Sequence, residues 1–247
     1  TASDLFRVAF GRAATAELPV EVSASDLTGL KMTLNAGVRV SLRVSIEGRE
    51  LSSFPDFEKI RVGLRPRRGQ WIGGTRQQGP LGSDGAGAID YVGNGEYRVW
   101  IDEGISDLYI KEATIEDVDV LNGFWKLSGT PTGALRIALG DKPGRVEGTL
   151  TDASSKPVPG VQVVLIPEKL RYRDELYKTV DTDEKGRFGF RAIAPGDYRI
   201  FAWEALEPFA YFNPELLSKY EQQGQFVHVS EASQQTVDVK MIPAPKD

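Results

Sequence analysis

Hydrophobic and polar residues alternate in many short runs along the chain, and each run is bounded by glycine, proline, aspartate or serine. Alternation with a period of two places successive side chains on opposite faces of an extended chain, so each run predicts a β-strand with one buried face. Many short strands at this spacing are typical of a β-sandwich. The predicted strands are 38–46, 60–64, 97–101, 135–139, 145–150, 161–166, 187–190, 198–203, 226–230 and 236–241.

One segment departs from this alternation and predicts a helix. The sequence "PELLSKYEQQ" (214–223) follows Asn213, which can cap a helix, and begins with Pro214, which is well suited to a first helical turn. Gly224 is expected to end the helix.

The strand pattern is repeated within the chain. Residues 83–101 align with residues 182–202 when two extra residues are allowed in the second copy. Each copy contains Asp-x-x-Gly, a strand, and then glycine, an acidic residue, tyrosine and arginine at the start of the next strand. The chain is therefore expected to contain a tandem repeat.

A polar turn followed by a final alternating strand occurs three times, at 22–34, 127–139 and 229–241. The first of these endings is not preceded by the earlier strands of a repeat, so we expect the chain to be a piece of a longer protein. The predicted domains are 1–35 as the C-terminal remnant of a preceding sandwich, a β-sandwich at 36–143 and a second β-sandwich at 144–247.

The second copy resembles a known family. "GRVEGTLTDASSKPVPGVQVVLIP" (144–167) and "TDEKGRFGFRAIAPGDYRIFAWE" (182–204) resemble the carboxypeptidase regulatory-like domain. The resemblance implies an all-β chain of tandem prealbumin-like (transthyretin-like) seven-stranded sandwiches, with one short helix in the C-terminal domain. It also implies a bacterial multidomain protein that is extracellular, periplasmic or associated with the outer membrane. The module of this family does not itself carry the carboxypeptidase zinc site.

Composition and charge narrow the choice of function. The net charge of −5 disfavours nucleic acid and anionic membrane surfaces as general partners. No apolar run approaches 18 residues, so we expect no direct membrane insertion. The chain has no cysteine and His228 is its one histidine, which excludes zinc–thiolate and two-histidine metal sites. We therefore expect no metal, no cofactor and no enzyme activity.

The stretch "DTDEKGRFGF" (181–190) places Asp181, Asp183 and Gly186 at positions 1, 3 and 6 of a calcium-binding EF-hand loop. The remaining ligand positions hold Lys185 and Ala192, which cannot bind the ion as that loop requires. A hairpin turn needs only an aspartate and a glycine between two alternating runs. We interpret the stretch as a turn.

Large aromatic side chains are the candidate ligand-binding groups on the strands. Trp100 is expected on the same face as Arg98, and Phe201 and Trp203 on the same face as Arg199. Aromatic rings beside charged groups can bind sugars, because the apolar face of a pyranose stacks on the ring. The alternative is that segment 205–223 or a neighbouring domain covers this face.

A long glycine-rich loop, 65–87, holds the remaining candidates, Trp71 and Arg68, together with further arginines. Loops of this length are often functional or mobile. The sequence thus predicts a non-catalytic structural or interaction module whose partners are neighbouring domains or envelope proteins. The alternative is a carbohydrate-binding module that holds polysaccharide through Trp71, Trp100, Phe201, Trp203 and Arg68.

Overall fold

A computed structural model describes residues 20, 26, 28–32, 36–67, 75–76, 80–103 and 107–244, with the backbone alone at 75–76 and 102–103. The predicted remnant 1–35 lies mostly outside these residues, and Arg68 and Trp71 lie wholly outside them. The chain divides into two compact units, the first made of 1–105 and 110–139 and the second of 106–109 and 140–247. The predicted boundaries after residues 35 and 143 remain predictions.

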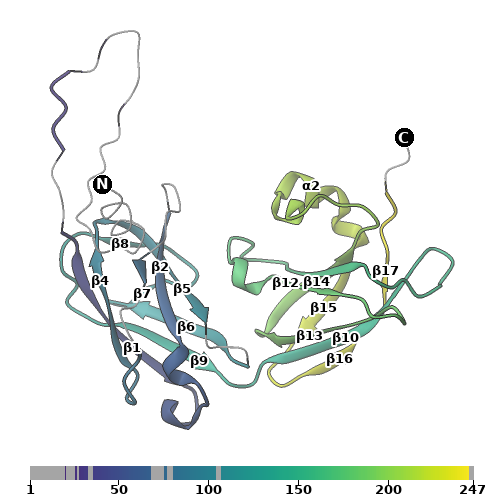
Figure 1. The fold of residues 1–247 in the computed structure, drawn as a ribbon, viewed down its shortest axis with the longest axis horizontal. Helices are drawn as coiled ribbons and strands as arrows, with labels where there is room; N and C mark the ends of the chain where they lie inside the picture. Colours follow the sequence, from purple (N-terminus) through teal and green to yellow (C-terminus); the bar gives the residue numbers. More distant parts are fainter. Residues whose placement is uncertain are drawn as a thin grey trace. The chain divides into compact units, whose positions relative to one another are not determined.

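The first unit is built from two sheets (Figure 1). Its strands within the described residues are β1 (Val38–Ile46), β2 (Arg61–Pro66), β3 (Thr75–Arg76), β4 (Ala86–Val92), β5 (Gly95–Glu103), β6 (Tyr109–Ile115), β7 (Val118–Asp119), β8 (Trp125–Leu127) and β9 (Leu135–Gly140). One sheet has the order β4-β1-β9-β6-β7 and the other the order β3-β2-β5-β8. Two 3₁₀ turns, Leu51–Ser53 and Phe57–Lys59, join β1 to β2.

The second unit has the same strand order as the first except that β6 and β7 have no counterpart in it, and it adds a helical segment (Figure 1). Its elements are β10 (Gly144–Thr151), β11 (Gln162–Pro167), β12 (Lys178–Asp181), β13 (Arg187–Ile193), β14 (Gly196–Ala202), α2 (Pro214–Tyr220), β15 (Gln225–Val229), β16 (Gln234–Thr236) and β17 (Val239–Lys240), with 3₁₀ turns at Asp174–Leu176, Ala210–Phe212 and Glu221–Gln223. The sheets are β13-β10-β16, with β17 also paired to β10, and β12-β11-β14-β15. With β16 and β17 taken as two halves of one last strand, the unit is a seven-stranded sandwich, and the predicted fold class is confirmed.

The first and last strands of each unit are parallel neighbours. In the first unit β1 pairs with β9 from Leu42 opposite Leu135 to Ile46 opposite Leu139. In the second unit β10 pairs in the same sense with β16 and then with β17. Only three residues, 141–143, separate the last strand of the first unit from the first strand of the second.

The two copies align without the insertion that the sequence suggested. Tyr97 donates a hydrogen bond from its hydroxyl to the Gly93 carbonyl at 3.0 Å, and Tyr198 donates one to the Ala194 carbonyl at 2.8 Å. Tyr97 and Tyr198 are 101 positions apart in the sequence. The turn glycines Gly85 and Gly186, which both have a positive φ, are also 101 positions apart. The predicted two-residue insertion is therefore wrong. Equivalent residues of the two copies differ by the same number of positions at the turn and in the strand that follows it.

Strand β14 divides its side chains between two hydrophobic clusters, as the alternation predicted. Tyr198, Ile200 and Ala202 belong to the core between the sheets. Phe201 and Trp203 belong to a second cluster on the outer face. β6 was missed in the sequence because its buried and exposed residues come in adjacent pairs rather than in alternation.

The predicted helix is present. Asn213 accepts a hydrogen bond from the Glu215 backbone N–H on its side-chain oxygen at 2.9 Å, and Pro214 opens α2. Capping by asparagine satisfies an N–H group that the helix itself cannot pair. Among the residues that the structure describes, no helix is both long and apolar enough to cross a lipid bilayer.

Candidate functional site

The aspartate-rich stretch 181–190 is a hairpin turn, as interpreted. The Asp183 carboxylate accepts hydrogen bonds from the backbone N–H groups of Lys185 and Arg187, each at 2.8 Å. Gly186 adopts a φ of 72° and donates its N–H to the Asp183 carbonyl. These bonds hold the pKa of Asp183 below its ordinary value, with the bond from Arg187 as the largest cause. The carboxylate thus stabilises a turn.

His228 lies on the exposed face of β15. Its Nδ1 is 2.6 Å from Oδ1 of Asp197 on the adjacent strand, and its side chain is 64% exposed. The contact joins two neighbouring strands on the surface of the second unit. Nowhere in the described ranges do three or more His, Asp or Glu side chains gather in a way that would hold a metal ion.

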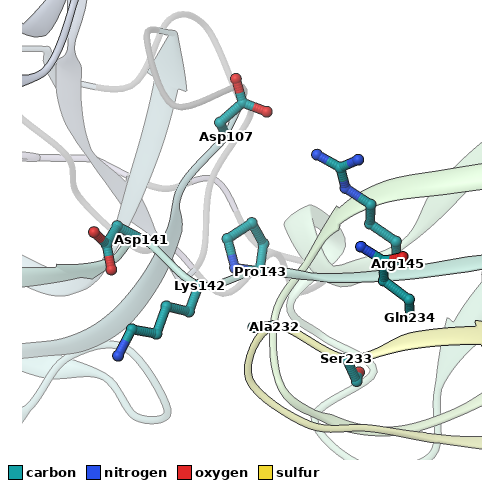
Figure 2. Close-up of a pocket in the computed structure, with 8 residues that line it drawn as sticks. All are labelled: Asp107, Asp141, Lys142, Pro143, Arg145, Ala232, Ser233 and Gln234. Carbon is teal, nitrogen blue, oxygen red and sulfur yellow. The ribbon is translucent and has the colours of Figure 1, made fainter.

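A hollow of about 420 Å³ lies at the start of β10. Figure 2 shows its lining of charged and small side chains, in which Asp141 and Lys142 point away from Arg145. The backbone closes one side of it, where the Ala232 N–H bonds to the Lys142 carbonyl at 2.9 Å.

A partly buried group of charges lies beside Tyr198. The Nε of Arg173 contacts a Glu175 oxygen at 2.7 Å. Burial lowers the pKa of Lys178, while the Glu175 charge opposes that shift. Burial also raises the pKa of Tyr198 well above its ordinary value. Arg173 and Glu175 thus form an ion pair within the second unit.

The outer face of the second unit is covered by its own chain. Phe201 is 1% exposed and Trp203 7% exposed. Their rings stack with centroids 5.1 Å apart, and Tyr220 meets Trp203 edge-on at 5.9 Å. Leu217 of α2 completes the covering layer.

Phe201 and Trp203, which the sequence offered as candidate ligand-binding residues, therefore do not form an exposed aromatic row. A sugar needs an accessible ring face, and here both rings are covered by residues of the connection between β14 and β15. Segment 205–223 covers this face, which was the alternative interpretation of the sequence.

The equivalent face of the first unit is different. Trp100 is half-buried and lies directly across from Gly63 of β2, where the second unit has Val164 across from Phe201. A Cβ on Gly63 would lie 2.1 Å from the indole Nε1 of Trp100. The glycine therefore gives the indole the space to lie flat across the sheet.

One arginine contacts this indole and two more lie nearby on the same sheet. Arg65 holds its guanidinium carbon 5.5 Å from the centre of the Trp100 ring, which is within the range of a cation–π contact. Arg98, which is buried with 8% of its surface exposed, lies directly across from Arg65 on β5. Arg67 holds its guanidinium carbon 5.1 Å from the centre of the Phe124 ring and binds Glu96 at 3.0 Å. Trp100 is thus the one predicted site residue that the described structure leaves partly accessible on a charged face.

Several residues of this face were not identified as site residues from the sequence. Arg65 and Arg67 were assigned to a loop, but Arg65 lies in β2 and Arg67 follows it directly. Phe124, which is 38% exposed, had no signal beyond its own hydrophobicity. On the second unit, Phe209 is 70% exposed, and the aromatic-rich run "PFAYF" (208–212) could have drawn attention to it.

Comparison with solved structures finds pilins among the similar chains. No match was found among curated proteins. Among solved structures, the minor pilin GBS52 of Streptococcus agalactiae is 13% identical over 84% of this chain and 98% of the pilin, with a TM-score of 0.35. A streptococcal ancillary pilin is 13% identical over 92% of this chain and 70% of its own, with a TM-score of 0.33. The major pilin subunit of Bacillus cereus is 11% identical over 81% and 99%, with a TM-score of 0.27.

The family comparison concerns the second unit alone. The model of the carboxypeptidase regulatory-like domain matches residues 145–241, which run from the start of β10 to just past β17. This is the segment that the sequence motifs indicated. Over these residues the second unit is similar to the carboxypeptidase regulatory-like domain.

Proposed function

We propose that the chain is a non-catalytic structural and interaction module of a secreted or envelope-associated protein. Its partners are neighbouring domains of the same polypeptide or other envelope proteins, in an extracellular, periplasmic or outer-membrane-associated setting. The family of the second unit supports this role. So does the use of Asp183, His228 and Arg173 in turns and ion pairs.

One observation carries the structural role: the first and last strands of each unit are parallel neighbours. Tension applied to the two ends of a unit pulls these strands in opposite directions along their length. All the hydrogen bonds between them then resist together in shear. Antiparallel first and last strands would instead separate one bond at a time. The short segment 141–143 transmits tension from one unit to the next.

Single-molecule pulling tests this role, and the absence of cysteine allows attachment points to be introduced freely. With Lys142→Cys and Pro243→Cys, force loads β10 against β16 and β17 in shear. With Ser154→Cys and Pro243→Cys, force peels the same strands from one end. Lys142, Ser154 and Pro243 are all exposed. We expect a clearly higher unfolding force in the shear geometry, and equal forces in the two geometries would contradict the structural role.

A second experiment tests the non-catalytic part of the proposal. The purified chain is incubated with chromogenic glycosides, esters and peptides, and product formation is compared with that of heat-denatured protein. We expect no difference. A saturable activity that is lost on heating would contradict the proposal.

Carbohydrate binding is a second candidate function, favoured by the half-buried Trp100 beside arginines. Trp71 and Arg68 remain predicted ligand-binding residues. Fluorescence titration with polysaccharides tests this candidate, with Trp71→Ala and Trp100→Phe as the variants. Loss of a saturable response in Trp100→Phe supports binding at this face, and a response unchanged in both variants contradicts it.

A further inference from the structure

The connection between β14 and β15 carries large aromatic side chains to the surface as well as covering the sheet. Within residues 203–224, Phe209 is 70% exposed and Phe212 is 41% exposed. Phe209 is the most exposed of the large hydrophobic side chains in the described part of the chain. A single exposed apolar residue needs no explanation, whereas neighbouring ones on a shared support are typical of a binding surface.

Four aromatic rings pack together here, and we call them the aromatic ridge: Tyr177, Phe209, Tyr211 and Phe212. The centre of the Phe212 ring lies 4.6 Å from that of Tyr177 and 4.8 Å from that of Tyr211. The centre of the Phe209 ring lies 6.4 Å from that of Tyr211, which is 5% exposed and belongs to the buried cluster of the outer face. The exposed rings therefore stand on a buried base, so they have little freedom to lose when a partner binds.

The backbone at Phe209 does not favour a phenylalanine. The Ala210 N–H donates to the Glu207 carbonyl at 3.0 Å, which closes a four-residue turn with Pro208 and Phe209 at its centre. Phe209 has a φ of 64° and a ψ of 3°, and after a proline these angles define a type II turn, in which glycine or asparagine is preferred at this position. A bulky residue there costs stability, and its exposed ring returns little of it to the fold. A contact with another molecule explains why the ring is present.

We infer that the aromatic ridge docks an arginine-rich segment of a partner protein. Guanidinium groups of that segment stack on Phe209 and Phe212 and pair with Glu207 and Glu215. The inference rests on the proposed role of the chain as an interaction module. It names the chemistry of one partner and the surface that holds it.

Charge identifies the partner as basic. Residues 204–218, which carry the exposed rings, contain three glutamates and no lysine, arginine or histidine. Glu207 and Glu215 flank the rings in the sequence, and both are exposed. Glu207 begins the turn described above, and the Glu215 N–H donates to the side chain of Asn213, which directly follows Phe212. An ionised carboxylate only accepts hydrogen bonds, so the partner has to supply both the donors and the positive charge.

Arginine meets both requirements at once. Its guanidinium group is planar, stacks on aromatic faces and carries forked N–H donors that match a carboxylate. A neutral sugar can stack on the same rings, but it leaves the charge of the two glutamates without a counterpart. A second copy of the chain also fits less well, because a symmetric pair would bring Glu207 and Glu215 against their own copies.

The experiment uses the full chain and a fluorescein-labelled peptide of four Arg-Tyr repeats, with binding followed by fluorescence anisotropy. We expect saturable binding that weakens as salt is added. A peptide of four Glu-Tyr repeats keeps the rings and reverses the charge, so it should bind more weakly by about tenfold or more. Hydroxyethylcellulose, a soluble neutral polysaccharide, should not displace the Arg-Tyr peptide.

Variants locate the site. Glu207→Lys reverses the charge beside the aromatic ridge and should weaken binding of the Arg-Tyr peptide by about tenfold. Glu184→Lys makes the same change at an exposed position in the turn between β12 and β13 and should leave binding nearly unchanged. Phe226→Ala removes a ring that is 47% exposed on β15, which lies at the opposite edge of the sheet from β12, and should also leave binding unchanged.

Phe209→Gly separates binding from folding. Glycine is the residue that the turn favours, so this variant should keep or raise the midpoint of urea denaturation. The same variant removes the most exposed ring, so it should weaken binding by about tenfold. A lowered midpoint would show that the ring serves the fold of the second unit and would overturn the inference.

Four other results would also overturn it. Equal binding of the Glu-Tyr peptide would reject a basic partner, and unaltered binding by Glu207→Lys would reject the surface. Displacement by hydroxyethylcellulose would assign the ridge to a neutral sugar. A dimer in sedimentation experiments that Phe209→Gly disrupts would assign it to a second copy. The unfolding force is measured without peptide, so the structural role is judged separately.

Discussion

Tyr198 anchors the turn that precedes its own strand. Its hydroxyl donates to the Ala194 carbonyl at 2.8 Å while its ring, which is 2% exposed, lies in the core. Tyr198→Phe keeps the ring and leaves that carbonyl without its donor, so we expect a loss of about 1–3 kcal/mol in the free energy of unfolding. Urea denaturation measures this loss. Tyr91→Phe, at an exposed tyrosine, should change stability little, and an equal effect in both variants would contradict the explanation.

Asp183 makes the stability of its turn depend on pH. Hydrogen bonds to its carboxylate lower its pKa from the ordinary value of 3.8, so the folded state prefers the charged form. The stabilisation is complete above that value and is lost as the pH falls through the lower pKa of the folded state. Asp183→Asn should therefore be less stable than the parent at neutral pH, and the difference should shrink in acid. NMR titration of the carboxyl carbon checks the direction, and an Asp183 pKa above the ordinary value would contradict it.

Two turns of the second unit each contain a glycine, but for different reasons. Gly186 and Gly160 have φ values of 72° and 68°, so an alanine at either position is strained by roughly 1–2 kcal/mol. At Gly186 a Cβ would also lie 2.9 Å from Pro157 and 3.0 Å from the Leu150 carbonyl oxygen. At Gly160 nothing lies within 4 Å. Gly186→Ala should thus destabilise the second unit more than Gly160→Ala, and the reverse order of urea midpoints would show that contacts do not decide the difference.

Helix α2 is held on the sheet by one fully buried leucine. Leu217 is 1% exposed and belongs to the cluster with Phe201 and Trp203. Leu217→Ala should cost about 2–5 kcal/mol and loosen the cover over the indole. Denaturation and iodide quenching followed by tryptophan emission report both effects as differences between variant and parent, because the other three tryptophans are unchanged. Lys219→Ala, on the exposed side of the helix, should change neither.

The alternation of residues predicts which face of a strand each side chain occupies, because that pattern is local. It assigned Tyr198 to one face of β14 and Trp203 to the other, as the structure has them. It could not predict that Trp203 is buried, since this depends on the path of the connection that follows the strand. The sequence could not predict the surroundings of Trp100 either. They depend on Gly63, which is distant in the sequence, and on the register between strands β2 and β5.

At the scale of the whole molecule, each unit has its own buried residues, and we expect two unfolding transitions. Tyr97 and Tyr198 occupy equivalent positions in the first and second units and make equivalent hydrogen bonds. Tyr97→Phe should lower one transition and Tyr198→Phe the other. Urea denaturation monitored by hydrogen exchange assigns each transition to its unit. A single transition lowered by both variants would contradict independent unfolding.

The connection between β14 and β15 has a consequence for how such a sandwich can vary. It runs through 203–224 and covers the outer face of its own sheet, whereas the matching connection of the first unit, from β5 to β8, holds β6 and β7, which lie in the opposite sheet. Two connections of similar length at the same place in the sandwich therefore do different work. One seals a sheet face and the other widens the opposite sheet, while the strands on either side keep their order.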